Sequence, residues 1–569
     1  MRRSNVKVLL AVGVATLVAG TLFLGTGRSQ PSSHAVRATR PDSALPIWSA
    51  GQAVVAAKSV STKVVTARPH VTRALRSITP LRAKRITGSG ESEGAYSISS
   101  RPVRDRALQR ARGSGMPTPL QNFDGLSNVD GTLRPDTSGD VGPNHYMQWI
   151  NLSFAIYNKQ GAMVYGPAAG STLFPNSSVC RTANGGDPVI LYDQFAGRWF
   201  ATQSAYLNLV NGPYYQCVAV SQTSDPTGAW CSYQFQTHST KFTDYAKFGV
   251  WPSQNAYVMT SPQYLRASSF SGMGVWAFER NALLSCRSAR FVYQDLTSIA
   301  PDLPRILPAD ADGTLAPPAN APAPLLAMNW NGSGLQPNTL QLWNLGVNWG
   351  QSPSLSISHV SDLATAAYDS NMCNYSRACV AQPATTAKLD ALSDRLMYRL
   401  AYRNFGNHQS MVVNHTVDVG NDHAGIRWYE LVNSAGKWSI GQQGTYAPDA
   451  TNRFMGSAAM DAAGDIAIGY SVSDGATTSP GVRYAGRLAS DPPGLLSQGE
   501  VTLVNGTGVQ TQQSSHWGDY SMMSVDPTND CTFWYAQEYY STTGQMNWRT
   551  RIGSFRFPQC SAAPTSRPR

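Results

Sequence analysis

The feature that most constrains this chain is a β-hairpin pattern that recurs along its length. In most copies a small or acidic residue opens a short strand of alternating apolar residues, a polar turn follows, and a second strand is rich in aromatic residues. The copies lie at 139–161, 186–205, 243–262, 393–418, 455–474 and 518–540. A single hairpin cannot bury its own apolar faces, so such copies must pack on one another.

The stretch 338–349 predicts a seventh copy with a divergent start. Seven copies give a period of about 63 residues, which suits four-stranded propeller blades with long loops. The hairpins at 214–235 and 424–442 are expected to supply outer strands. We therefore predict an all-β chain that forms a β-propeller of seven blades.

Two β-sandwich domains are the alternative architecture. Against it, the hairpin pattern continues through the middle of the chain without a linker. The one Pro/Ala-rich stretch, 306–326, is short. We expect it to be an exposed loop between blades.

Basic charge is concentrated at the two ends of the chain. The whole chain has a net charge of +11, but residues 116–560 hold 24 Lys and Arg against 30 Asp and Glu. A net-negative body gives no reason to expect a nucleic-acid partner. Residues 29–115 are basic and poor in aromatic residues, which predicts a disordered stalk or pro-segment ahead of the propeller at 116–560. Residues 561–569 are expected to be a C-terminal tail.

The first 28 residues look like an export signal. A positive start, MRRSNVK, precedes an apolar run of about 18 residues. This pattern predicts either a cleaved signal peptide or an uncleaved signal anchor at 1–28. The body is then extracellular or periplasmic, and membrane attachment is expected only through that anchor.

Eight cysteines fit an oxidising compartment. None forms a C-x-x-C motif, so we expect structural disulfides and no thiolate zinc site. We predict the pairs Cys373–Cys379 and Cys531–Cys560. The remaining four cysteines allow three connectivities, between which the sequence does not choose: Cys180, Cys217, Cys231 and Cys286.

Four stretches resemble a family of exported bacterial β-propeller proteins that has no established function. The stretches are GDPVILYDQFAGRWF, LSDRLMYRLAYRNFGNHQSMVVNHTVD, MGSAAMDAAGDIAIGYSVSD with PGVRYAGRLASDPPG, and HWGDYSMMSVDPTNDCTFWYAQEYY. The resemblance covers about 117–560 and implies the propeller fold without an activity. A more distant resemblance is to sialidase-type propellers, because TSDPTGAW (223–230) looks like a degenerate Asp-box turn.

Aspartates open five of the copies in comparable places: Asp140, Asp187, Asp244, Asp394 and Asp519. In a propeller the innermost strands of all blades converge at one mouth of the central channel. A ring of carboxylates there could bind Ca²⁺ or perform acid–base chemistry on a sugar. The alternative is that each aspartate caps its own strand.

Histidines and arginines add candidates to this mouth. His145, His408, His415 and His516 lie in or beside the copies. Arg395, Arg399 and Arg403 share one face of a strand, where they could clamp the carboxylate of an acidic sugar. The alternative is that they form ion pairs between blades, for example with Asp394.

These patterns lead to one set of candidate residues. The catalytic candidates are Asp187, Asp519, His408 and Arg395. The ligand-binding candidates are Asp140, His145, Asp244, Asp394, Arg399 and Tyr520. The candidate calcium ligands are Asp140, Asp187 and Asp244, and Ca²⁺ is the one cofactor that we consider.

We predict that the chain is an exported monomeric propeller that binds a glycan or another cell-surface ligand at one mouth. Two alternatives use the same scaffold. One is a glycoside hydrolase or polysaccharide lyase that takes carboxylates from different blades. The other is a protein-interaction scaffold, and the fold alone cannot choose among the three.

Overall fold

The computed structural model describes residues 62–83, 103–301, 303, 305–329 and 338–560. These residues belong to one compact unit, Ala57–Arg569. The expected signal peptide or anchor (1–28) and the expected tail (561–569) lie outside the described residues. Within the described ranges, no helix has both the length and the apolar character needed to cross a membrane.

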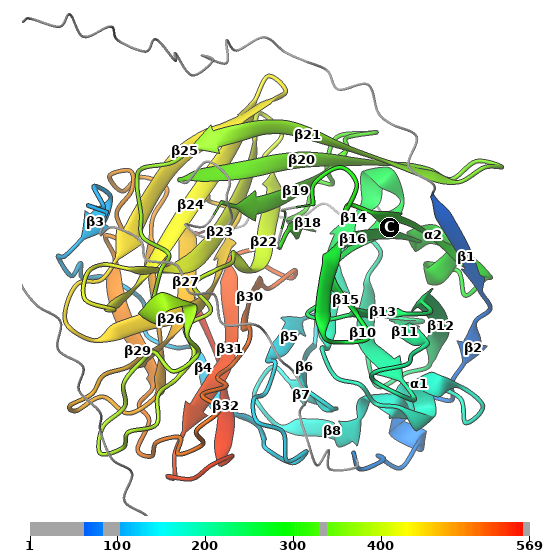
Figure 1. The fold of residues 1–569 in the computed structure, drawn as a ribbon, viewed down its shortest axis with the longest axis horizontal. Helices are drawn as coiled ribbons and strands as arrows, with labels where there is room; N and C mark the ends of the chain where they lie inside the picture. Colours follow the sequence, from blue (N-terminus) through cyan, green and yellow to red (C-terminus); the bar gives the residue numbers. More distant parts are fainter. Residues whose placement is uncertain (1–61, 84–102, 302, 304, 330–337, 561–569) are drawn as a thin grey trace, which may run out of the picture. The chain divides into compact units, whose positions relative to one another are not determined.

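Strands dominate this unit and pair into four-stranded antiparallel groups (Figure 1). The first groups are β5–β8 (Ser138–Val141, His145–Ile150, Ser153–Asn158, Met163–Ala169), β9–β12 (Val189–Asp193, Arg198–Tyr206, Tyr214–Ser221, Trp230–His238), β14–β17 (Lys247–Trp251, Ala256–Leu265, Ser269–Glu279, Ala289–Asp295) and β18–β21 (Leu307–Asp312, Ala323–Met328, Thr339–Asn348, Ser354–Ala364). The later groups are β22–β25 (Met397–Asn404, Gln409–Asp418, Ala424–Ser434, Lys437–Tyr446), β26–β29 (Asn452–Met460, Ile466–Ser473, Gly481–Arg487, Gly499–Val504) and β30–β32 with β4 (Met522–Val525, Thr532–Tyr540, Trp548–Arg556, Gln121–Ser127).

Short elements fill the connections. The helical turns are α1 (Val179–Thr182), α2 (Arg280–Leu284), η1 (Leu75–Ser77), η2 (Gly170–Leu173), η3 (Pro252–Gln254) and η4 (Cys373–Tyr375). The short strand β13 (Lys241–Thr243) pairs with β15.

The first strands of the groups contact one another in a closed series. β5 contacts β9, β9 contacts β14, and the series continues through β18, β22, β26 and β30 back to β5. β18 and β22 form a parallel pair, which joins two groups into one nine-stranded sheet. β4 precedes all these strands in the chain, yet it completes the last group by pairing with β32. The arrangement is β-propeller-like, and we call these first strands the inner strands.

Aromatic side chains pack between neighbouring groups, as the sequence indicates. The Trp534 ring of β31 stacks on Tyr146 of β6 with ring centres 5.3 Å apart. Phe200 of β10 packs against Phe248 of β14 with ring centres 5.3 Å apart. Such contacts bury the apolar faces that a single group leaves open.

The Pro/Ala-rich stretch 306–326 is the exposed loop that we predict from its composition only over 313–322, which connects β18 to β19. The stretch also contains β18 and the start of β19, and Ala309 and Leu325 are fully buried. β18 lies between β14 and β22, and alanine side chains leave room for that close approach. The copy predicted at 338–349 therefore begins earlier, because residues 339–348 form its third strand, β20.

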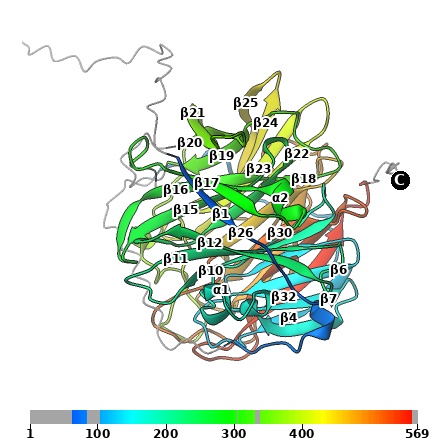
Figure 2. The same cartoon turned by 90° about the vertical axis from the view of Figure 1, so that its right-hand side faces the viewer.

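The described part of the expected stalk is also not a solvated linker. β1 (Lys63–Ala67) pairs with β17 (Figure 2). β2 (His70–Val71) pairs with β12. β3 (Leu108–Gln109) runs parallel to β25. The prediction of disorder over 29–115 is thus wrong for 62–83 and 103–115, since open sheet edges accept main-chain hydrogen bonds from a segment of any composition.

Four disulfides are present, and both predicted pairs are confirmed. Cys373 is bonded to Cys379, and Cys531 to Cys560. The pairs that the sequence leaves open are Cys180–Cys217 and Cys231–Cys286. The second of these links β12 to the residues after α2 and so joins two neighbouring groups. Four disulfides indicate an oxidising, extracytoplasmic environment.

Candidate functional site

Four predicted aspartates lie directly before inner strands: Asp187 before β9, Asp244 before β14, Asp394 before β22 and Asp519 before β30. Hydrogen bonds join these strand starts. The Tyr245 amide donates to Asp187 Oδ2 at 3.1 Å, and the Tyr245 hydroxyl donates to the Asp519 carbonyl at 2.9 Å. The Tyr520 hydroxyl donates to the Pro188 carbonyl at 3.0 Å. We call this end of the inner strands the mouth.

Lys247, the first residue of β14, lies among the carboxylates of the mouth, and no sequence pattern indicated it. Its side chain is buried between two aromatic faces, with Nζ 3.5 Å from the centre of the Tyr245 ring and 3.7 Å from that of Tyr520. Among the described residues, Nζ donates one hydrogen bond, to the Ala246 carbonyl at 3.3 Å, and forms no ion pair.

Burial lowers the pKa of Lys247 to about 8. Four carboxylates oppose this effect by favouring the charged amine: Asp187, Asp136, Asp519 and Asp244. The net shift is downward, so desolvation of the ammonium outweighs their attraction. The mouth therefore holds one amine facing carboxylates from four strand starts.

Asp140 does not belong to this set. It lies within β5, and its Oδ2 accepts a hydrogen bond from the Tyr192 amide of β9 at 2.7 Å. Asp136, two residues before β5, takes the equivalent place at the mouth. Asp136 is paired with Arg134, whose Nε also contacts Asp519 Oδ2 at 2.5 Å.

The segment between β21 and β22 covers part of the mouth. Its Arg377 contacts His516 Nδ1 at 2.9 Å and Asp390 at 3.1 Å. The Asp390 amide donates to the Ser515 carbonyl at 2.9 Å. The Cys373–Cys379 bond lies in this segment, and the mouth side chains beneath it are almost fully buried.

Arg395 lies at the mouth, but its guanidinium is already paired. It binds the neighbouring Asp394 through two hydrogen bonds of 2.7 and 3.1 Å. The same guanidinium lies 5.0 Å from the centre of the Tyr245 ring. Arg395 therefore helps to hold the wall of the mouth together.

Glu538 is a buried acid behind the mouth. Its side chain accepts a hydrogen bond from the Gly518 amide at 2.6 Å. Burial raises the pKa of Glu538 well above its ordinary value, and the Asp519 charge adds to the rise. Burial therefore favours the protonated form of Glu538 more than it would be favoured in an exposed glutamate.

Arg399 and Arg403 make ion pairs between groups, which is the alternative that the sequence left open. Arg399 of β22 donates to Asp310 at 2.8 Å and to both oxygens of Asp312 at 2.6 Å. Arg403 donates to both oxygens of Asp530 at 2.7 and 2.9 Å. Their guanidinium groups are satisfied within the protein.

The aspartates around Arg399 have raised pKa values. Burial raises the pKa of Asp140 to about 7 and that of Asp310 to about 6, and the Arg399 charge limits both shifts. Asp140 and Arg399 therefore lie in a buried cluster inside the inner strands. The structure does not bring them together with Lys247.

His145 and His408 lie at the opposite end of the inner strands. His145 is the first residue of β6, after the turn that ends β5, and burial lowers its pKa. His408 lies in the turn between β22 and β23, where its ring stacks on Phe405 at 4.7 Å. Neither histidine is near the predicted catalytic aspartates. His516 does lie at the mouth, where its Nδ1 is 2.7 Å from the Arg134 guanidinium.

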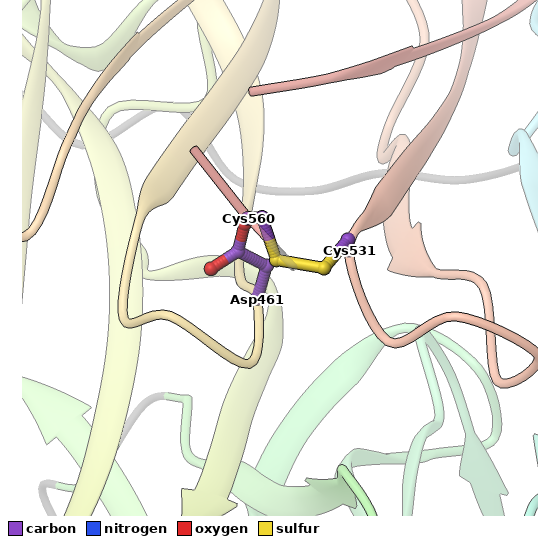
Figure 3. Close-up of side chains that lie close together, drawn as sticks. All are labelled: Asp461, Cys531 and Cys560. Carbon is purple, nitrogen blue, oxygen red and sulfur yellow. A yellow bond between two sulfur atoms is a disulfide. The ribbon is translucent and has the colours of Figure 1, made fainter. Parts of the chain in front are cut away.

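The predicted calcium ligands are not gathered at one point, because Asp140 lies in the Arg399 cluster and Asp187 and Asp244 lie at the mouth. Within the described ranges, the one group of three side chains close enough to hold a metal is Asp461, Cys531 and Cys560 (Figure 3). Those cysteines are bonded to each other, so neither offers a thiolate.

No protein-family model matches the chain, and no curated protein matches it. Solved structures give only distant similarity. An exo-β-1,3-galactanase from Clostridium thermocellum is 10% identical over 66% of this chain and 78% of its own, with a TM-score of 0.27. An α-L-arabinanase from Penicillium chrysogenum, solved with arabinobiose, is 9% identical over 66% of this chain and 93% of its own, with a TM-score of 0.26. An endo-1,5-α-L-arabinanase from Thermotoga petrophila is 10% identical over 77% of this chain and 100% of its own, with a TM-score of 0.24. TM-scores of this size assign neither a fold nor an activity to the chain.

Proposed function

We propose that the chain is an extracytoplasmic seven-bladed propeller that binds a glycan at the mouth. Each four-stranded group is then one blade, and the closed series of inner strands supports the count of seven. The four disulfides support the location outside the cytoplasm. Monomeric state and attachment through residues 1–28 are part of the same proposal.

The observation behind the proposed ligand is the setting of Lys247. An ammonium group has three hydrogen-bond donors. Within the described residues, Lys247 donates one hydrogen bond, to the Ala246 carbonyl. Carboxylates from four strand starts surround it without an ion pair to it. A hydroxyl group accepts from an amine and donates to a carboxylate. A sugar with neighbouring hydroxyl groups therefore matches both kinds of group, whereas an anion would face the carboxylates.

Titration calorimetry with a panel of neutral oligosaccharides tests this proposal. We expect at least one oligosaccharide to bind, and Lys247→Met and Asp187→Asn to weaken it at least about tenfold, because each removes a hydrogen bond to a charged group. Asp225→Asn is the matched control, since Asp225 is an exposed aspartate in the turn before β12 and should leave affinity unchanged. Binding that both mouth variants retain in full would overturn the proposed site.

A glycoside hydrolase is the second candidate, and one observation favours it. Burial raises the pKa of Glu538 well above its ordinary value, and the nearby Asp519 is paired with Arg134. Glycosidases use one protonated and one ionised carboxyl group. Release of new reducing ends from a polysaccharide, lost in Glu538→Gln, would support hydrolysis. Binding without product would support the binding protein.

A further inference from the structure

A second candidate site lies outside the mouth, in a cleft of about 720 Å³. One wall is the extended segment 103–110, which carries β3. The facing wall comes from Asp369 and the end of β23 with Val419 and Gly420. No residue of the mouth lines this cleft.

The segment 103–110 is attached to the body through alternate side chains. The side chain of Asp105 is buried, pairs with Arg427 at 3.1 Å and accepts a hydrogen bond from the Thr445 hydroxyl. Gln109 is also buried, and its Oε1 accepts from the Leu496 amide at 2.8 Å. Between them, β3 pairs Leu108 with Thr445 of β25. The odd-numbered residues therefore face the body.

The even-numbered residues face outward, because side chains of an extended segment alternate between two faces. Arg104, Arg106 and Arg110 are exposed, and all three line the cleft. None of the three has an ion pair or a side-chain hydrogen bond within the described residues. They form a row of guanidinium groups on one face, which we call the arginine row.

The acids of the facing wall are already engaged with the backbone. Asp418 Oδ1 accepts from the Gly420 amide at 2.7 Å and from the His423 amide at 3.2 Å. Asp369 Oδ1 accepts from the Asn371 amide at 2.8 Å. Within the described residues, neither acid forms an ion pair with the arginine row.

We infer that the arginine row binds an acidic polysaccharide, through carboxylate or sulfate groups spaced along the polymer. A guanidinium donates two parallel hydrogen bonds to either group. The disulfides indicate an extracytoplasmic location. At such a location we expect an acidic polysaccharide as the partner, not a nucleic acid. The inference does not depend on the glycan proposed for the mouth.

Biolayer interferometry with the full chain tests the arginine row. The probes are polygalacturonate, which carries carboxylates, dextran sulfate, which carries sulfates, and neutral dextran. We expect one or both acidic polymers to bind and dextran not to bind. Replacing Arg104, Arg106 and Arg110 by Ala should weaken binding at least about tenfold and reduce its salt dependence. Replacing them by Lys should retain part of the affinity.

The matched control removes the same charge elsewhere, by replacing the exposed Arg68, Arg287 and Arg556 with Ala. This control should stay within about twofold of the parent, because long-range charge is screened by salt. An equal loss of affinity in both triple variants would contradict a binding role for the arginine row. So would the absence of binding to either acidic polymer, or a DNA duplex that binds as tightly as those polymers. If Lys247→Met still binds the acidic polymer, the polymer site is distinct from the mouth.

Discussion

Lys247 and Tyr520 come from different four-stranded groups, and Lys247 Nζ lies 3.7 Å from the centre of the Tyr520 ring. Tyr245 covers the amine from another side at 3.5 Å. Residues far apart in the chain thus build one buried polar centre. Its position at the starts of the inner strands makes it the strongest candidate for a ligand site.

Lys247→Met should change the pH dependence of stability. The folded-state pKa of Lys247 is about 8 and the ordinary value is 10.5. Between these values only the unfolded chain holds the proton, so the cost of burying the ammonium falls as pH rises. The stability of Lys247→Met relative to the parent should therefore be higher at pH 7 than at pH 10.5, by about 3 kcal/mol at most. Urea unfolding at both pH values measures it, and a constant difference would contradict the lowered pKa.

Asp461→Asn should stabilise the chain at high pH. Burial raises the folded-state pKa of Asp461 to about 7 from 3.8. The stabilisation from its proton is complete below pH 3.8 and is lost as pH rises through 7. The variant should gain up to about 4 kcal/mol over the parent between pH 4 and pH 8. Thermal unfolding at the two pH values tests the gain.

Asp474→Asn provides a control of opposite sign. Asp474 also lies in a hairpin turn, but its carboxylate accepts hydrogen bonds from the Ala476, Thr477 and Thr478 amides, at 2.8, 2.7 and 2.9 Å. The folded-state pKa of Asp474 is lowered to about 2, despite the opposing effect of burial. Its stabilisation is present above pH 3.8 and is lost as pH falls through 2. Parallel pH profiles for the two variants would contradict both assignments.

Arg399→Met should destabilise the chain by about 3–5 kcal/mol, because Asp310 and Asp312 would lose their buried counter-charge. Adding Asp310→Asn should recover part of the loss, since a neutral amide does not need that counter-charge. Arg549→Met is the control, and should cost less than about 1 kcal/mol because its pair with Asp124 is exposed. If Asp310→Asn recovers none of the stability lost in Arg399→Met, the predicted charge pairing in the Arg399 cluster is wrong.

The disulfides should differ in what they contribute. Cys231 and Cys286 are 55 residues apart, and Cys373 and Cys379 are 6 apart. The chain-entropy estimate gives about 4 kcal/mol for the first bond and about 2 kcal/mol for the second. Paired Ser substitutions with denaturant unfolding measure both values. A larger loss for the Cys373–Cys379 pair would show that the segment over the mouth depends on its bond for more than entropy.

The recurring hairpins predicted most of the fold, because strands such as β22 and β31 are rich in aromatic residues and adjoin polar turns. The pattern failed at β18, where small alanines and prolines occupy a crowded inner strand and look like a loop. It also could not foresee β1 and β2, because pairing at a sheet edge uses main-chain groups and leaves little trace in composition.

The candidate site was predicted in part. Aspartates that open a strand pattern predict four residues of the mouth: Asp187, Asp244, Asp394 and Asp519. In the first group this pattern indicates Asp140 instead of Asp136, because Asp136 lies two residues before β5 and Asp140 lies within it. Lys247 carries a weak sequence signal, a single lysine between aromatic residues at the start of a strand, and only the convergence of separate strands shows its importance.

A crystal structure of the chain with the oligosaccharide that binds best in the panel tests the proposed function most directly. We expect a sugar hydroxyl within hydrogen-bond distance of Lys247 Nζ, and another within that distance of a carboxylate from Asp136, Asp187, Asp244 or Asp519. A ligand bound at the opposite end of the inner strands, or on the outer edges of the groups, would contradict the proposed function.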